Sequence, residues 1–81
     1  SSEELVKFLA TAALRLDSEG DSASSTRLKD GVACLNGLTD GWALLLESVE
    51  GVLKSPGRRL SVESEASLRE AQAVLKSVVY R

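Results

Sequence analysis

The sequence predicts an all-α domain, built as an antiparallel bundle of three helices with a long central helix. Three stretches, at about 3–17, 23–54 and 61–80, place apolar residues at steps of three and four, which is the period of one helix face. No run alternates apolar and polar residues for long enough to predict a strand. The chain has 81 residues and is 43% hydrophobic, so we expect one small domain rather than a disordered chain.

The first stretch begins with a capping signal, because Ser1 and Glu4 have the spacing of a capping box. The sequence DSEGD at 17–21 then interrupts the apolar pattern, since Gly20 favours a helix end and either Asp21 or Ser22 can cap a following helix. We therefore expect a helix over 3–17 and a turn after it. The apolar stripe of this helix consists of Leu5, Leu9, Ala12 and Leu16.

The second stretch keeps one apolar phase from 23 to 54, across the sequence NGLTDGW at 36–42. A preserved phase favours one continuous helix. Glycine costs about 1 kcal/mol relative to alanine inside a helix, so the glycines here favour instead a kink or a break near Gly37–Gly41, which would give a four-helix arrangement. A second face of mostly small residues predicts close contact with neighbouring helices: Ala33, Gly37, Gly41, Leu44, Ser48 and Gly51.

The third stretch follows a break at Pro56 and Gly57, and Ser61 is a natural N-cap for it. Glu63 and Glu65 favour the positive start of this helix. Its stripe consists of Ser64, Leu68, Ala71, Leu75 and Val78. Together the stripes of the three stretches predict a core that contains Leu9, Leu35, Leu45, Val49, Leu68 and Leu75.

The composition argues against catalysis and against a cofactor or metal centre. The sequence has no histidine, no phosphate-binding loop and no zinc-ligand spacing, and its lone cysteine, Cys34, lies in an apolar arc without a base to activate it. A net charge of −2 argues against a nucleic-acid partner. No apolar run approaches the ~20 residues of a membrane-spanning helix. We therefore expect a non-enzymatic domain that binds no cofactor, metal or nucleic acid.

The cysteine content of the chain indicates its cellular compartment, and its first residues indicate whether it is part of a longer protein. A lone thiol suits a reducing compartment, so we expect an intracellular protein, cytoplasmic rather than nuclear. The chain opens at SSEEL without methionine, which indicates a fragment of a larger protein. Residues 1–81 would then form one helical bundle domain of that protein.

The leading functional interpretation is a helical protein–protein interaction or self-association module of an adaptor or scaffold type. A central helix of about 48 Å would be longer than the two neighbouring helices, which would measure about 21 and 30 Å. Part of its apolar face would then need cover from a helical partner or from a second copy of the chain. Tryptophan is enriched at interface hot spots, and the predicted partner-binding residues are Trp42, Leu38, Leu46 and Leu53.

The two turns carry opposite charges, with acidic residues at 17–21 and basic residues at 54–59. On either side of an unbroken central helix they would lie at opposite ends of the bundle, where each could steer a partner electrostatically. Binding of the basic end to the cytoskeleton or to a membrane surface is a weaker interpretation, because three positive charges are few. The predicted basic end consists of Lys54, Arg58 and Arg59.

The sequence KSPGRRLS at 54–61 contains two overlapping kinase consensus patterns. Ser55 begins S-P-x-R, the form favoured by cyclin-dependent kinases, and Ser61 ends R-R-x-S, the form favoured by cyclic-AMP-dependent protein kinase. A phosphate on Ser61 would lie at a helix start, where negative charge is stabilising, whereas a phosphate on Ser55 would follow a helix end, where it is unfavourable. Two interpretations of the loop are therefore open: a plain basic connector between helices, and a regulatory site.

The segment LATAALRLDSEGDSASSTRLKDGVACLNGL at 9–38 resembles the first two helices of MIT domains. The shared features are an alanine- and leucine-rich first helix, an acidic turn with glycine, and the run Gly31-Val32-Ala33-Cys34-Leu35. MIT domains are three-helix modules that bind short helical tails of ESCRT-type proteins. The resemblance covers under half of the chain and implies a three-helix fold, with short helical motifs of ESCRT-type or cytoskeletal proteins as partners.

Overall fold

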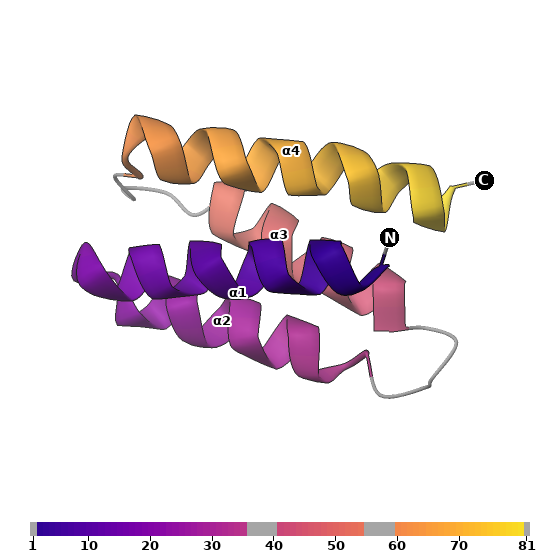
Figure 1. Cartoon of the computed structure of the whole chain (residues 1–81), viewed down its shortest axis with the longest axis horizontal. Helices are drawn as coiled ribbons and strands as arrows, with labels where there is room; N and C mark the ends of the chain where they lie inside the picture. Colours follow the sequence, from indigo (N-terminus) through magenta and orange to yellow (C-terminus); the bar gives the residue numbers. More distant parts are fainter. Residues whose placement is uncertain (1, 36–40, 55–59, 81) are drawn as a thin grey trace.

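The computed structural model describes residues 2–35, 41–54 and 60–80, and within them the chain forms four helices and no strand (Figure 1). Helix α1 spans Ser2–Ser18, α2 spans Ser22–Ala33, α3 spans Gly41–Lys54 and α4 spans Val62–Val79. Each helix packs against the next one along the chain, and α4 packs against α1, so the four enclose one core. The predicted all-α class is confirmed.

The long central helix expected over 23–54 is replaced by two helices, α2 and α3. The last turn of α2 tightens, because the N–H groups of Cys34 and Leu35 donate to the carbonyl oxygens of Gly31 and Val32 three residues earlier. The principal extents of 32 × 20 × 20 Å could not hold a straight helix of about 48 Å. The alternative of a break near Gly37–Gly41 is therefore the correct one, although residues 37–40 lie outside the described residues.

Small residues bring α2 and α3 into close contact. The sequence predicted that these residues would contact neighbouring helices of one long central helix, and the structure gives them a different role. A Cβ on Gly41 would lie 2.6 Å from the carbonyl oxygen of Cys34, so only glycine lets α3 begin against the end of α2. Farther along, a Cβ on Gly31 would lie 2.8 Å from that of Ser48. The small residues thus pack the two halves of the expected central helix against each other, rather than against separate neighbours.

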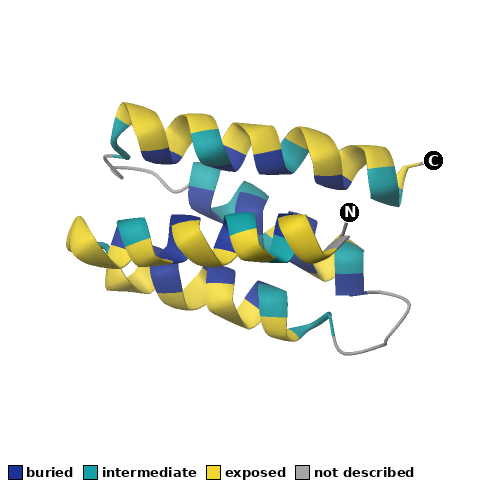
Figure 2. Ribbon diagram, in the orientation of Figure 1, coloured by how far each residue is buried: buried dark blue, intermediate teal, exposed yellow. Residues whose placement is uncertain are grey.

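The buried residues of all four helices lie on the faces that are turned toward the other helices, as the dark blue parts of the ribbon in Figure 2 show. Five of the six predicted core residues are completely buried, and the sixth, Leu35, is half-buried and packs against the core. The predicted turn at 17–21 is also confirmed, since Gly20 has a φ of +85° and the Asp21 carboxylate accepts the Ser24 N–H at 3.2 Å. None of the described helices has both the length and the hydropathy of a membrane span.

Candidate functional site

The contact between α1 and α4 joins the first and last helices of the described chain, and it carries two distinct features. At the end of α1 and the start of α4 lies a set of polar side chains, which we call the α1–α4 polar cluster: Arg15, Glu19, Ser61, Glu63, Ser64 and Ser67. Toward the other end of the same contact lies an open depression, the α1–α4 groove. We treat both as the candidate functional site.

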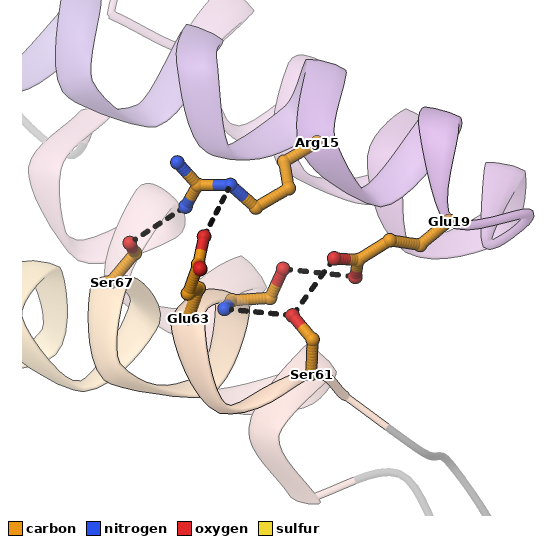
Figure 3. Close-up of polar contacts among 6 residues, drawn as sticks. Arg15, Glu19, Ser61, Glu63 and Ser67 are labelled. Atoms are coloured by element: carbon orange, nitrogen blue, oxygen red, sulfur yellow. Dashed lines mark hydrogen bonds and ion pairs between the residues drawn. The ribbon is translucent and has the colours of Figure 1, made fainter.

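The polar cluster is centred on the carboxylate of Glu19, which binds two serines of α4 (Figure 3). The Ser61 hydroxyl donates to Glu19 Oε2 at 2.8 Å, and the Ser64 hydroxyl donates to Oε1 at 3.0 Å. Ser61 Oγ also accepts the Ser64 backbone N–H at 3.1 Å, which confirms Ser61 as the N-cap of α4. One carboxylate from the α1–α2 turn therefore holds the first turn of α4.

The position of Glu19 is electrostatically favourable. Its negative charge lies at the start of α4, where the helix dipole and the unpaired backbone N–H groups favour an anion. Ser64 is 0% exposed, so Glu19 also supplies the acceptor that this buried hydroxyl needs. Arg15 adds a hydrogen bond of 3.1 Å from its guanidinium to Ser67 Oγ, while its 3.9 Å ion pair with the exposed Glu63 is weak.

Replacing Glu19 with alanine is expected to lower the free energy of unfolding by about 1–3 kcal/mol, because it leaves the buried Ser64 hydroxyl without its acceptor. The matched control is Glu63→Ala, which removes a carboxylate of the same cluster that is 81% exposed and that makes, among the described residues, the long ion pair to Arg15. We expect the control to cost under about 1 kcal/mol. Urea titrations followed by circular dichroism compare the two, and equal losses would refute the central role of Glu19.

The α1–α4 groove is an apolar depression with an acidic residue on each edge. Its volume is about 250 Å³. Phe8 is half-buried and packs against the core from one side, and Val74 is 45% exposed on the other side. The residues that line the groove come from two helices: Glu4, Leu5 and Phe8 of α1, with Glu70, Ala71 and Val74 of α4.

The predicted partner-binding residues lie at different depths, and Trp42 lines an open depression together with Glu3, Val6 and Leu35. Leu46 is only 3% exposed and belongs to the core, and Trp42 and Leu53 pack against that core. Leu38 lies outside the described residues. The premise of a protruding central helix is wrong, because α2 and α3 have 12 and 14 residues and are no longer than the 17 and 18 residues of α1 and α4.

The predicted separation of an acidic end from a basic end is also wrong. Glu19 of the acidic turn accepts a hydrogen bond from Ser61 at the start of α4, and α3 ends with Lys54 at that same end of the bundle (Figure 1). The reason is the additional chain reversal between α2 and α3. Lys54 is exposed at the last residue of α3, whereas Ser55, Arg58 and Arg59 lie outside the described residues.

No metal or thiol site is visible in the part of the chain that the structure describes. Among those residues, no group of three or more histidine, cysteine, aspartate or glutamate side chains could hold a metal ion. The thiol of Cys34, which follows the last residue of α2, is half-buried and donates to the carbonyl oxygen of Asp30 at 3.4 Å.

Sequence reasoning missed Arg15 and Glu19, and it had only a partial signal for the groove. Phe8 and Val74 flank the predicted stripes of their helices, and residues at the edge of a stripe are the ones that line a groove between two helices. Glu19 had no such signal, because its partner Ser61 is 42 residues away.

Comparison with known proteins gave no match, whether to a protein-family model, to a curated protein or to a solved structure. The MIT resemblance implied three helices, whereas the described residues form four.

Proposed function

We propose that this chain is a non-catalytic helical interaction module, which binds a basic amphipathic helix of a partner protein in the α1–α4 groove. The observation that supports the proposal is the groove itself. It is open to solvent, and its apolar lining comes from Leu5 and Phe8 of α1 and from Ala71 and Val74 of α4. An exposed apolar surface with polar edges is typical of a protein-interaction site.

The shape of the groove favours a helix over a small molecule. A volume of about 250 Å³ is below the range of about 300–1,000 Å³ for small-molecule pockets, but it can take one or two side chains. A helix laid along a groove presents such side chains at steps of three and four residues. The antiparallel pair α1 and α4 offers a straight track for it, with Phe8 and Val74 as the apolar contacts.

The edges of the groove favour a basic partner. Glu4 on α1 and Glu70 on α4 are both exposed, and both line the groove. Lysine or arginine residues that flank the apolar face of a bound helix could lie against these carboxylates. Such complementarity raises the association rate and selects the orientation of the partner more than it raises the affinity.

Two other partners remain as alternatives to be distinguished by experiment. The MIT resemblance favours a short helical motif of an ESCRT-type or cytoskeletal protein, which is a special case of a helix in a groove. Self-association would place a helix of a second copy there instead. The two acidic edges favour a basic partner over a second copy, whose own groove edges carry the same charge.

The expected result is that a basic amphipathic peptide binds in the groove and that Val74→Arg weakens this binding at least tenfold. The probe is a 14-residue leucine–lysine helix with leucine at i, i+3, i+4 and i+7, in the helix-in-groove pattern. Its binding is mapped by NMR shift changes, which we expect at Leu5, Phe8 and Ala71. The arginine places bulk and positive charge on the apolar floor.

The matched control is Ala73→Arg, which adds the same charge at the neighbouring, exposed position of the same helix. Ala73 does not line the groove, so this variant should bind the peptide as the unmodified chain does. A leucine–glutamate peptide tests the charge preference and should bind more weakly. Shift changes outside the groove, or equal binding by both variants, would refute the proposal. A molar mass that doubles in the free chain and returns to the monomer in Val74→Arg would assign the groove to a second copy instead.

A further inference from the structure

The residue that ends the motif Arg58-Arg59-Leu60-Ser61 is also a residue that joins α1 to α4. Ser61 is half-buried at the N-cap of α4, and its hydroxyl donates to Glu19 and accepts from the Ser64 N–H. The oxygen atom that a basophilic kinase would phosphorylate is therefore also the atom that makes the contact between the helices. This coincidence has a direct consequence for the effect of a phosphate.

We propose that Ser61 is a phosphorylation site for a basophilic serine kinase, and that its phosphate expels Glu19 and loosens the end of α1 from the start of α4. The contacts that carry this are the two hydrogen bonds from Ser61 and Ser64 to one carboxylate. The proposal stands on these contacts and on the sequence motif, and it does not depend on what the α1–α4 groove binds.

The chemical step is an ordinary phosphoryl transfer from ATP, which the kinase supplies. The Ser61 oxygen forms a bond to the γ-phosphorus, and the bond between that phosphorus and the oxygen bridging it to the β-phosphate breaks. The hydroxyl proton passes to the catalytic base of the kinase, and ADP leaves. Ser61 must first leave Glu19 and Ser64, which requires opening only the first turn of α4, and terminal turns open at little cost.

The phosphate cannot preserve the contact with Glu19. Ser61 Oγ loses the hydrogen that it donates over 2.8 Å, and a group of about −1.5 to −2 charges then faces a carboxylate. The phosphate itself is well placed at the start of α4, where backbone N–H groups and the helix dipole favour an anion. Glu19 is therefore the group that leaves, and the Ser64 hydroxyl can donate to the phosphate in its place.

This consequence changes the expectation from the sequence, which considered α4 alone. The start of α4 keeps an anionic cap, so the helix itself is preserved. The α1–α2 turn loses both of its Glu19 hydrogen bonds to α4, so the packing of α1 against α4 weakens at this end. Phosphorylation is thus expected to destabilise the bundle while it leaves α4 helical.

The test treats the folded chain with the catalytic subunit of cyclic-AMP-dependent protein kinase and Mg-ATP, and locates the phosphate by mass spectrometry. Modification at Ser61 should lower the Tm by roughly 4–8 °C. Hydrogen exchange should become faster at 16–21 than in the first turn of α4. The Ser61→Ala variant should incorporate no phosphate at this position and should not change its Tm on treatment.

The decisive control is Glu19→Gln, which keeps the shape of the side chain and removes its charge. Its amide can donate to the phosphate, so at least half of the phosphate-dependent loss in Tm should disappear. This variant should also be phosphorylated faster, because its neutral side chain holds the Ser61 hydroxyl less strongly. No incorporation at Ser61 in the folded chain would overturn the proposal. An equal loss in Tm with and without the Glu19 charge would also overturn it.

Discussion

Replacing Leu68 with alanine is expected to lower the free energy of unfolding by about 2–5 kcal/mol, as the truncation of a buried leucine does. Leu68 is 0% exposed near the middle of α4, a helix that packs against both α3 and α1. Its truncation leaves a cavity in the core, and the surrounding structure can fill it only in part. A denaturant titration followed by circular dichroism measures the loss.

The matched control is the same substitution at Leu14 of α1, whose side chain is 64% exposed. We expect Leu14→Ala to change the free energy of unfolding by at most about 0.5 kcal/mol, because it removes little buried surface and alanine is a good helix former. Similar losses at both positions would show that exposure does not distinguish them. A negligible loss at Leu68 would show that the inner face of α4 is assigned wrongly.

The sequence was sufficient to predict which residues of each helix face the core. The predicted stripe of α4 runs through Ser64, Leu68, Ala71, Leu75 and Val78; the first four are buried and Val78 is half-buried. The reason is that a step of three or four residues fixes a helix face whatever surrounds the helix. The start of α4 at Ser61 was also predicted from the sequence, because an N-cap is a local interaction within four residues.

The reversal between α2 and α3 was harder to predict, because periodicity identifies a face and not the direction of the axis. The inward residues of two antiparallel helices around one core can keep the phase of a single long helix. Leu28 of α2 and Leu46 of α3 share one helical phase and are 0% and 3% exposed, so this phase fits two helices around one core as well as it fits one continuous helix. The glycine-rich sequence at 36–42 was the better evidence.

Glu19 contacts the start of α4 because the chain reverses between α2 and α3. The sequence alone could therefore not predict this contact. With three helices, the acidic turn and the start of the last helix lie at opposite ends of the bundle. With four, they lie together, and Glu19 reaches Ser61 and Ser64. A contact between residues 42 positions apart follows from the number of chain reversals, not from any local pattern.

Replacing Gly31 with alanine is expected to destabilise the chain, although alanine is the better helix former by about 1 kcal/mol. The new Cβ would lie 2.7 Å from Ser48 Oγ and 2.8 Å from Ser48 Cβ. The hydroxyl could turn away, but the Cβ is fixed to the backbone of α3, so the two helices would have to separate. Overpacking of this kind costs about 1–3 kcal/mol, and we expect a net loss of about 1–2 kcal/mol in a urea titration.

The matched control is Gly51→Ala, at a different close contact between α2 and α3. There the nearest atoms to a new Cβ all belong to the guanidinium of Arg27, the far end of a flexible side chain. Arg27 is exposed and can move aside, so this variant should gain up to about 1 kcal/mol from helix propensity. A second variant, Ser48→Gly, removes the side chain that the methyl group introduced by Gly31→Ala would meet. If the backbone contact is the cause, the double variant should be more stable than the sum of its two single changes predicts. Strict additivity, or a gain at both glycines, would contradict the close packing of α2 against α3.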